Sequence, residues 1–414
     1  MAKRTLLLLL VGLLAGGAAR AESSGHLKSR LLAESYGDAS LLRDFGDPLA
    51  IDIEADLRLQ LATTVAGLGL DAAWQLAARH GESVASAREL AGLLPVAPTD
   101  SEARRALDLE DTLVDDGRRR AVQRIDRLAL SWTSERSVVR LGRQALTWGN
   151  GLYFSPLDIV NPFDPSTIDT EYKAGDDMLY LQNLRGNGDD VEAAWVFRRD
   201  PAGGPRAEVA TAALRYNGYA DDAEYQLLVA RHYGGTRVGL GGSLGVRGAV
   251  WRADLGLADA DGGGVEFVGN WSYGWRWRER NVTGALEYYF NGYGLHGGRY
   301  SLSALAAAPE LAARLARGDA FTVGRHYLAG VLDVELHPLY HLRPTLLANA
   351  VDRSALLQLV FTASLADNVT AVAVAELPLG PAGSEFRGLE SPVAGRYLSR
   401  RAGLFVQLAW YFPG

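Results

Sequence analysis

Charged side chains of both signs gather in and just before one long segment of the chain, where they could set an electric field across an opening. Residues 148–178 lack strand periodicity, and a long loop with Pro-containing turns and several aromatics argues for order and a functional role. Rings of charged side chains decide which polar solutes pass a constriction. The candidate constriction residues are Arg124, Arg127, Arg140, Arg143 and Gln144 before the segment, and Asp158, Asp164, Asp169, Glu171, Lys173, Asp176 and Asp177 within it. We expect the acids to face the arginines; the alternative is a solvated surface loop outside the fold.

Enzymatic chemistry finds little support. Residues 241–245 fit G-x-S-x-G, but a nucleophilic Ser243 would need a strand before it and a helix after it, and more alternating, Gly-rich residues follow instead. His337 and His341 lie on either side of Pro338, in a predicted turn, so we expect no metal pair. With 0 Cys, disulfides, thiolate metal sites and cysteine nucleophiles are excluded. We therefore expect no catalytic residue, no metal and no cofactor.

The elements that must position the charged residues show a period of two. From residue 48 onward, apolar and polar residues alternate over stretches separated by Gly-, Asp- and Asn-rich breaks, as in tilted transmembrane strands. In the first clear stretch one face carries Ile51, Ile53, Ala55, Leu57, Leu59 and Leu61. The opposite face, which we expect to line a lumen, carries Asp52, Glu54, Asp56, Arg58 and Gln60. The alternation recurs near residues 191–198, 224–229 and 357–365.

Repeated alternation of this kind predicts a closed barrel. Inside a bilayer every backbone polar group needs a partner, so the strands cannot leave free edges. Roughly 16–18 candidate strands are present, a size at which a barrel keeps an aqueous lumen. The expected fold is therefore all-β: a transmembrane antiparallel β-barrel of about 16–18 strands with an inward-folded loop. A soluble secreted β protein is the alternative.

The connections are expected to alternate in length. Short turns such as residues 366–368 would face the periplasm, and the longest connections, 81–100 and 292–320, would face outside. An Ala-, Leu- and Arg-rich piece within 301–317 predicts a short helix.

The beginning of the chain carries an export signal. Lys3 and Arg4, an apolar run and a small-x-small site ending at Ala21 predict a signal peptide over residues 1–21. Residues 22–47, polar and without alternation, would form a periplasmic N-terminal lead-in, and residues 48–414 the barrel. The formal net charge of −7 argues against a nucleic-acid partner.

The end of the chain carries an assembly signal. Leu404, Val406, Leu408, Trp410 and Phe412 alternate outward. This stretch resembles the aromatic C-terminal strand by which outer-membrane barrels are recognised by the barrel-assembly machinery, although Pro413 and Gly414 follow it here.

A family resemblance appears just before the long segment. Residues 142–151, Gly-Arg-Gln-Ala-Leu-Thr-Trp-Gly-Asn-Gly, resemble the Gly-Arg-Gln motif and following Gly-containing turn of alginate-export-like and uncharacterised proteobacterial porin families. In the alginate exporters, arginines line the lumen and attract an anionic polysaccharide. The resemblance implies that Arg143 lines the pore or anchors a loop. Alternation from Val139 and Leu141 places Arg143 outward, so this role requires a bulge, and the acidic face of residues 52–56 departs from an all-arginine pathway.

The sequence therefore predicts an outer-membrane porin that passes small polar solutes or an extended polysaccharide by passive diffusion. Its partners would be outer-membrane lipid, the barrel-assembly machinery and the solute. One alternative is an outer-membrane component of a system that moves lipids or hydrophobic compounds, which would need an apolar path through or beside the barrel wall and would show no ion conductance. A second is an outer-membrane hydrolase with a rim cluster that includes His232, His296 or His326.

Overall fold

The computed structural model describes residues 22–91, 101–200, 204, 206–259 and 264–412. The predicted signal peptide, residues 1–21, and the last two residues lie outside these ranges. The strands are β1 (Glu22–Ser35), β2 (Leu49–Val65), β3 (Leu68–Gly81), β4 (Glu110–Asp116), β5 (Arg119–Thr133), β6 (Ser137–Gln144), β7 (Asp176–Leu184), β8 (Asp190–Val196), β9 (Thr211–Ala220), β10 (Ala223–His232), β11 (Gly235–Val246), β12 (Ala249–Ala258), β13 (Gly264–Trp277), β14 (Arg280–Asn291), β15 (His326–His337), β16 (Tyr340–Asn349), β17 (Ser354–Ala366), β18 (Val369–Leu379) and β19 (Ala402–Phe412). The helices are η1 (Leu42–Asp44), α2 (Glu82–Ala91), α3 (Ser101–Arg104), α4 (Leu302–Ala306) and α5 (Pro309–Arg317).

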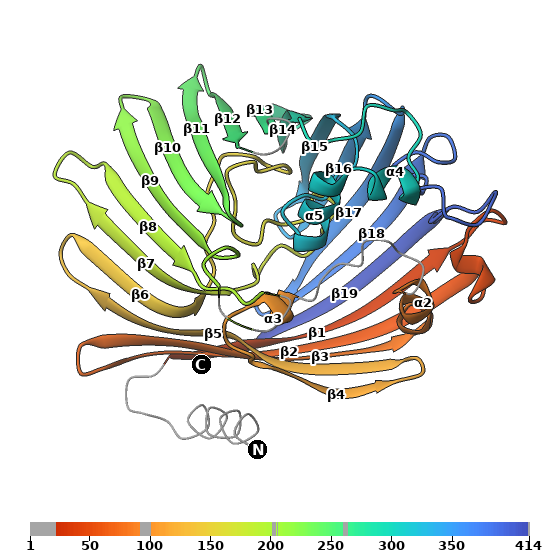
Figure 1. The fold of residues 1–414 in the computed structure, drawn as a ribbon, viewed down its shortest axis with the longest axis horizontal. Coiled ribbons are helices and arrows are strands. Elements are labelled where there is room, and N and C mark those ends of the chain that lie inside the picture. Colours follow the sequence, from red (N-terminus) through yellow and green to blue (C-terminus); the bar gives the residue numbers. More distant parts are fainter. Residues whose placement is uncertain (1–21, 92–100, 201–203, 205, 260–263, 413–414) are drawn as a thin grey trace.

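Antiparallel pairing closes these strands into one barrel (Figure 1). β1 pairs with β2 on one side and with β19 on the other, so the first and last strands meet. β3 pairs directly with β5, and the short β4 pairs with the first part of β5 where β6 does not reach. The closed wall therefore has 18 strands, which confirms the predicted all-β barrel.

β1 corrects the predicted N-terminal lead-in. Residues 22–47 were expected to lie outside the barrel, but Glu22–Ser35 is a wall strand in register with β2 and β19. Leu27 and Leu31 are exposed on the outer face, whereas His26 and Lys28 are buried on the inner face. The alternation is hard to see in the sequence because Ser29, a small polar residue, stands between the two leucines on the outer face.

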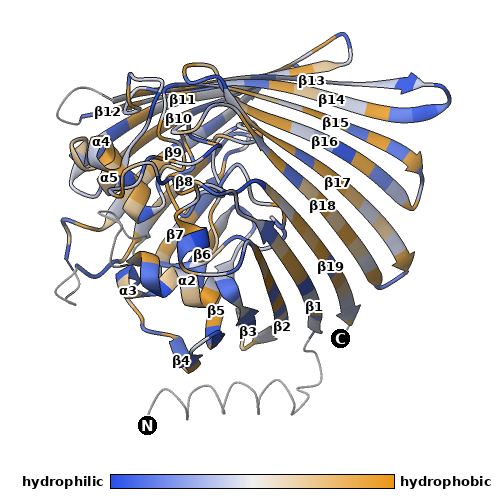
Figure 2. Cartoon of the chain, turned by 90° about the vertical axis from the view of Figure 1, so that its right-hand side faces the viewer, coloured by the Kyte–Doolittle hydropathy of each residue, from blue (hydrophilic) through white to orange (hydrophobic). Residues whose placement is uncertain are grey.

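The outer face of the barrel is apolar and the inner face polar, as the alternation predicts. Along β2, Ile51 and Ile53 are 49% and 59% exposed, while Asp52 between them is 5% exposed. Along β19, Leu408 and Trp410 are exposed and Ala409 is fully buried. In Figure 2 hydrophobic colour recurs along β15–β19 on the side that faces the viewer. A belt of this kind suits contact with lipid tails.

The two ends of the barrel differ as expected from the connection lengths. Short turns join the strands at the end where Glu22 and Phe412 lie, and the longer connections lie at the opposite end. Helices α2–α5 gather at the long-connection end (Figure 2), and α4 and α5 confirm the helix expected within 301–317. None of the helices in the described ranges has the length and apolarity that a membrane span needs.

An outward charge should therefore destabilise the barrel in proportion to its depth. We expect Leu408→Arg, in the middle of β19, to cost about 2–4 kcal/mol of unfolding free energy in lipid vesicles. Leu68→Arg, an outward residue beside the β2–β3 turn, should cost about 0–1 kcal/mol. Urea titration of vesicle-folded protein measures both. Equal costs at the two sites would contradict an outer belt in contact with lipid.

Candidate functional site

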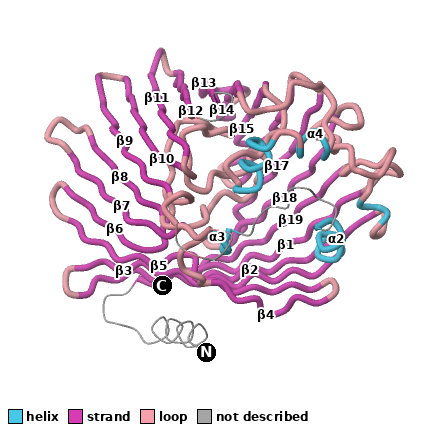
Figure 3. The backbone as a smooth tube through the Cα atoms, viewed as in Figure 1, coloured by secondary structure: helices cyan, strands magenta, loops and turns pink. Residues whose placement is uncertain are grey.

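The segment that joins β6 to β7, residues 145–175, lies inside the barrel (Figure 3). The Trp148 indole donates to Glu192 of β8, and Gln358 of β17 donates to the carbonyl of Ser166 at 2.9 Å. The amide of Gly175 reaches Asp126 of β5. Contacts to strands around the whole wall require the segment to cross the lumen, which confirms the predicted inward fold. We call residues 145–175 the lumen loop.

Two buried carboxylates hold the first half of the lumen loop by its backbone. Glu287 of β14 accepts hydrogen bonds from the amides of three consecutive residues, Leu152 to Phe154, at 2.6–2.9 Å. Asp254 of β12 accepts from the amide and side chain of Asn150 at 2.6 and 2.8 Å. Carboxylates are strong acceptors for amides that the chain cannot pair within regular structure. These wall acids therefore take the place of a strand partner for the loop.

The second half of the lumen loop is held by cations of β1. Lys28 lies 2.6 Å from Asp169 and 2.7 Å from Glu171, and Arg30 lies 2.8 Å from Asp169. Beside them the ring of Tyr172 stacks on His26, with centroids 5.3 Å apart, and the Arg58 guanidinium covers it. The predicted opposition of loop acids to wall bases therefore occurs at β1, on residues that the sequence predicts to lie outside the barrel.

Of the expected arginine partners, Arg143 does meet one of the predicted acids, Asp177 at 2.9 Å, but Arg124, Arg127 and Arg140 contact other groups. Arg124 donates to Gln75 of β3, and Arg127 donates to Asp126 and to the carbonyl of Lys173. Arg140 is exposed near the short-turn end of β6. Arg124, Arg127 and Arg140 belong to the wall at β5 and β6, whereas the loop has crossed to β1 by the time it presents its acids.

Other charged residues of the lumen loop serve the loop itself. Asp158 and Lys173 form a buried ion pair at 2.6 Å, which joins the outgoing and returning halves of the loop. Asp164 accepts from the amide and hydroxyl of Ser166, a local turn contact. The sequence cannot distinguish such internal contacts from charges that face the lumen.

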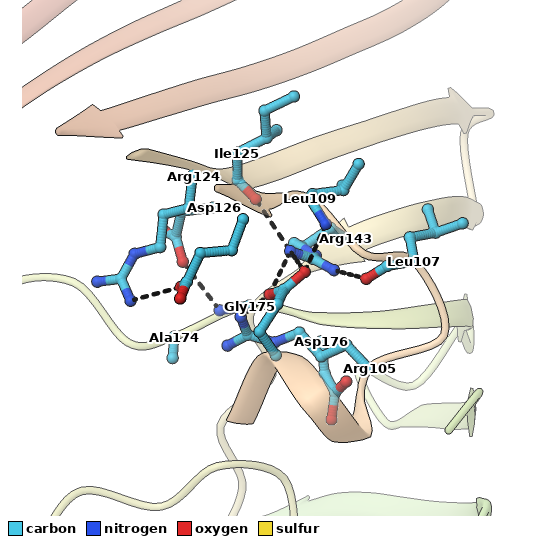
Figure 4. Close-up of polar contacts among 12 residues, drawn as sticks. Arg105, Leu107, Leu109, Arg124, Ile125, Asp126, Arg143, Ala174, Gly175 and Asp176 are labelled. Carbon is cyan, nitrogen blue, oxygen red and sulfur yellow. Dashed lines mark hydrogen bonds and ion pairs between the residues drawn. The ribbon is translucent and has the colours of Figure 1, made fainter. Parts of the chain in front are cut away.

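Arg143 is buried in the wall, which corrects its expected place in the pore but fits the other role that the resemblance implies, the anchoring of a loop. Its side chain is 0% exposed and lies 2.9 Å from Asp177 and 3.0 Å from Glu102, with carbonyl acceptors at Ile125 and Leu107 (Figure 4). It therefore anchors residues 101–109, not the lumen loop.

A glycine lets Arg143 leave the outward alternation of its strand. Gly142 has φ +127°, and a Cβ at that position would lie 2.1 Å from the carbonyl oxygen of Leu128. Only glycine adopts this conformation readily. The change in backbone direction expected before Arg143 is therefore present at Gly142. It turns the side chain of Arg143 into the wall and not into the pore.

The neighbours of Arg143 are also buried. Asp176 pairs with Arg198 at 3.1 Å, Asp177 with Arg143, and the Gln144 amide donates to the carbonyl of Met178. None of these three residues lines open space, so their expected place in the constriction is wrong.

Open space remains along the wall formed by β1–β5. One cavity of about 630 Å³ lies against the lumen loop at Asp169 and Tyr172, and a second of about 680 Å³ continues toward α2. The two share the lining residues Arg30, Glu54, Asp56 and Arg79. The predicted lumen face of β2 thus borders two adjoining cavities, with side chains of both charges on it.

The other residues considered for chemistry, Ser243, His337 and His341, lie in regular strands and hairpins. Ser243 lies within β11, and a hairpin turn into β12 follows it where a nucleophile elbow needs a helix. His341 pairs with Asp333 at 2.8 Å across the β15–β16 hairpin, and His337 ends β15. Within the described ranges, no group of three or more His, Asp or Glu residues could hold a metal ion.

Comparison with known proteins supports the fold. No protein-family model and no curated protein matches the chain. Among solved structures, OccAB2 of Acinetobacter baumannii aligns over 95% of this chain and 98% of its own, with TM-score 0.54 and 9% identity. OccK5 (OpdH) of Pseudomonas aeruginosa aligns over 95% and 98%, with TM-score 0.54 and 11% identity. A BenF-like porin from Pseudomonas fluorescens Pf-5 aligns over 96% and 100%, with TM-score 0.53 and 8% identity. The chain therefore has a porin-like transmembrane β-barrel fold.

Loss of the Arg143 guanidinium should destabilise the wall. In Arg143→Ala, Asp177 loses its buried countercharge, which we expect to cost about 3–5 kcal/mol of unfolding free energy. Arg143→Lys should recover only part of it, because an ammonium cannot reach two carboxylates and two carbonyls together. Arg136→Ala, at the exposed β5–β6 turn, is the control. A loss below about 1 kcal/mol in the alanine variant would contradict the anchoring role.

The loop between β18 and β19 should loosen as the pH rises. Glu385 in that loop accepts hydrogen bonds from Tyr327, Asn349 and the amide of Val323, and burial raises its pKa to about 7, with Asp352 adding to the shift. The pKa of Glu385 in the folded protein lies above its ordinary value of 4.5, so the folded loop favours the protonated carboxyl group. The contribution of Glu385 to the stability of the loop is therefore complete below pH 4.5 and is lost as the pH rises through 7.

Limited proteolysis checks this dependence. Cleavage within residues 380–401 should be faster at pH 8.5 than at pH 5.5, and Glu385→Gln should reduce the difference. If Glu385→Gln keeps the full pH dependence of cleavage, a group other than Glu385 causes it.

Proposed function

We propose that this chain is an outer-membrane channel through which small polar solutes diffuse passively, between the lumen loop and the wall formed by β1–β5. The observation that carries the proposal is the pair of adjoining cavities inside a closed barrel, which share charged side chains of both signs. A solute there would move past two positive side chains, Arg30 and Arg79, and two negative ones, Glu54 and Asp56. Fixed charges of both signs favour polar over apolar solutes.

The same proposal assigns the chain to the outer membrane of a Gram-negative bacterium. The apolar belt supports contact with outer-membrane lipid, and the outward Leu408 and Trp410 of β19 support recognition by the barrel-assembly machinery. The signal-peptide pattern of residues 1–21 supports export through the inner membrane.

The charged side chains on β1–β5 also decide between polar and apolar solutes. The alternative of lipid or hydrophobic-compound transport would need an apolar path through or beside the barrel wall, whereas the two cavities inside the barrel on β1–β5 carry charged side chains of both signs. The resemblance of residues 142–151 to alginate-export-like porins suggests an extended polysaccharide, but Arg143 would take no direct part, since it is buried. We propose no catalytic role for any residue.

The proposal is tested by single-channel conductance of the mature protein in a planar bilayer. We expect stepwise conductance in the wild type. Replacing residues 151–173 by a flexible glycine-serine linker should raise it, because the lumen loop then no longer fills the barrel. The replacement leaves Asp176 and Asp177 with their partners in the wall. Absence of conductance in both proteins would contradict a diffusion channel and favour a lipid conduit or a hydrolase.

A point variant tests the loop anchor without shortening the chain. Glu287→Ala leaves three loop amides without their acceptor. Each amide that finds no water in its place destabilises the bound position of the loop by about 1–3 kcal/mol. We expect larger current fluctuations and a higher mean conductance. Glu335→Ala, which removes a carboxylate bonded to Asn281 near the short turns, is the matched control. Identical traces from the two variants would show that Glu287 does not restrain the loop.

A further inference from the structure

The outer face of the barrel carries an apolar groove over β11–β16. Its volume is about 1030 Å³. Gly242, Ala253 and Gly269 form its floor, side by side on three neighbouring strands. Trp251 and Leu286 stand at its edges and are 53% and 62% exposed. Small residues thus hollow the surface where the surrounding belt carries large side chains.

The groove opens to the membrane and not to the lumen. Residues on the opposite parity of the same strands, Asn270 and Glu287, are buried against the lumen loop. The residues that stand out around the groove, including Leu328 and Leu346, are exposed and apolar. Its occupant is therefore in contact with the hydrocarbon of the bilayer.

An aromatic row leads from the groove to the short-turn end of the barrel. Trp271, Tyr273 and Trp275 of β13 stack in succession, with ring centroids 6.2 Å apart at each step. Trp277 ends the strand and is 54% exposed. From Trp271 to Trp277 the strand covers about 20 Å, and at a tilt of 35–45° this spans roughly 15 Å of depth, about one leaflet of hydrocarbon. The groove thus lies about one leaflet of hydrocarbon away from Trp277 at the end of the strand.

Unpaired arginines surround the end of this row. We call Arg247, Arg278 and Arg280 the basic tip; they come from the β11–β12 and β13–β14 hairpins, whose strands are adjacent in the sheet. All three are exposed, and within the described part of the chain none forms an ion pair or a side-chain hydrogen bond. Arg278 lies over the Trp277 ring at 5.4 Å. The end of the β13–β14 hairpin is hydrophilic in Figure 2.

We propose that the groove and the basic tip together bind an anionic phospholipid. One acyl chain lies in the groove along Trp271 and Tyr273, and the phosphate meets the basic tip at the interface. Arginine suits this role because its guanidinium binds phosphate oxygens in pairs, and each cation near an anionic surface adds to lipid binding. On the orientation proposed above, the lipid belongs to the periplasmic leaflet.

A second copy of this chain fits the groove less well than a lipid. Two copies in one membrane share their orientation, so an isologous contact over this face would place the two basic tips at the same depth and close together. Like charges would then repel at the contact. A phospholipid instead brings a negative charge to the tip and a flexible chain to the hollow.

Native mass spectrometry of the full barrel in detergent tests the site, with palmitoyl-oleoyl phosphatidylglycerol and phosphatidylcholine as probes. We expect the wild type to retain phosphatidylglycerol in preference. Arg278→Gln with Arg280→Gln should weaken its retention by about tenfold or more, since each arginine contributes about 1 kcal/mol. Arg136→Gln with Arg185→Gln, at two other short turns, is the matched control and should leave retention unchanged.

A second variant tests the groove separately from the charges. Ala253→Trp fills the floor and should reduce retention of both lipids, whereas Ala375→Trp, outward on β18, should not. Heat-modifiable mobility on gels, the difference in migration between unheated and heated samples, confirms that each variant folds. Equal retention of the two lipids by the wild type, or no loss in the arginine variant, would overturn the assignment. Wild-type dimers that Ala253→Trp converts to monomers would identify a second copy as the occupant. Because the readout is lipid retention, the outcome is separate from conductance.

Discussion

Closure of the sheet through β1 is the constraint on which the rest of this structure depends. A backbone amide that faces lipid without a partner is costly, so a membrane barrel must pair its first strand with its last. Here the pairing of β1 with β19 satisfies that requirement. The same strand supplies Lys28 and Arg30, which hold the returning half of the lumen loop. The strand that seals the wall is thus also the one that fixes the position of the loop inside it.

The interior is organised by charges that are matched across long distances in sequence. Glu287 and Asp254 hold the outgoing half of the lumen loop through backbone amides, and the cations of β1 hold the returning half through side chains. Between them, Asp158 and Lys173 join the two halves. Each of these charged side chains has a partner, which is the condition for a polar interior to remain ordered. The two cavities along β1–β5 are the space that these contacts leave.

The sequence predicts the wall better than it predicts the site. Alternation depends on neighbouring residues alone, so β2 and β19 could be assigned to inner and outer faces correctly. Partners inside the lumen depend on where the loop crosses, and no local pattern joins Asp169 to Lys28. Arg143 shows a further limit, because one glycine at φ +127° reverses the direction that strict alternation implies. β1 was missed for a simpler reason: a serine interrupts its apolar face.

The contact between the two ends of the chain also has a kinetic meaning. Gly25 pairs with Phe412, so nearly the full length of the polypeptide separates residues that must meet. Contacts between such distant residues slow folding, because the entropy of closing the intervening chain is lost before the pairing is gained. The strand made first has to wait, with one edge open, for the strand made last. Any product truncated before β19 would keep that edge open and be prone to aggregation, which makes completion of synthesis a precondition for a sealed barrel.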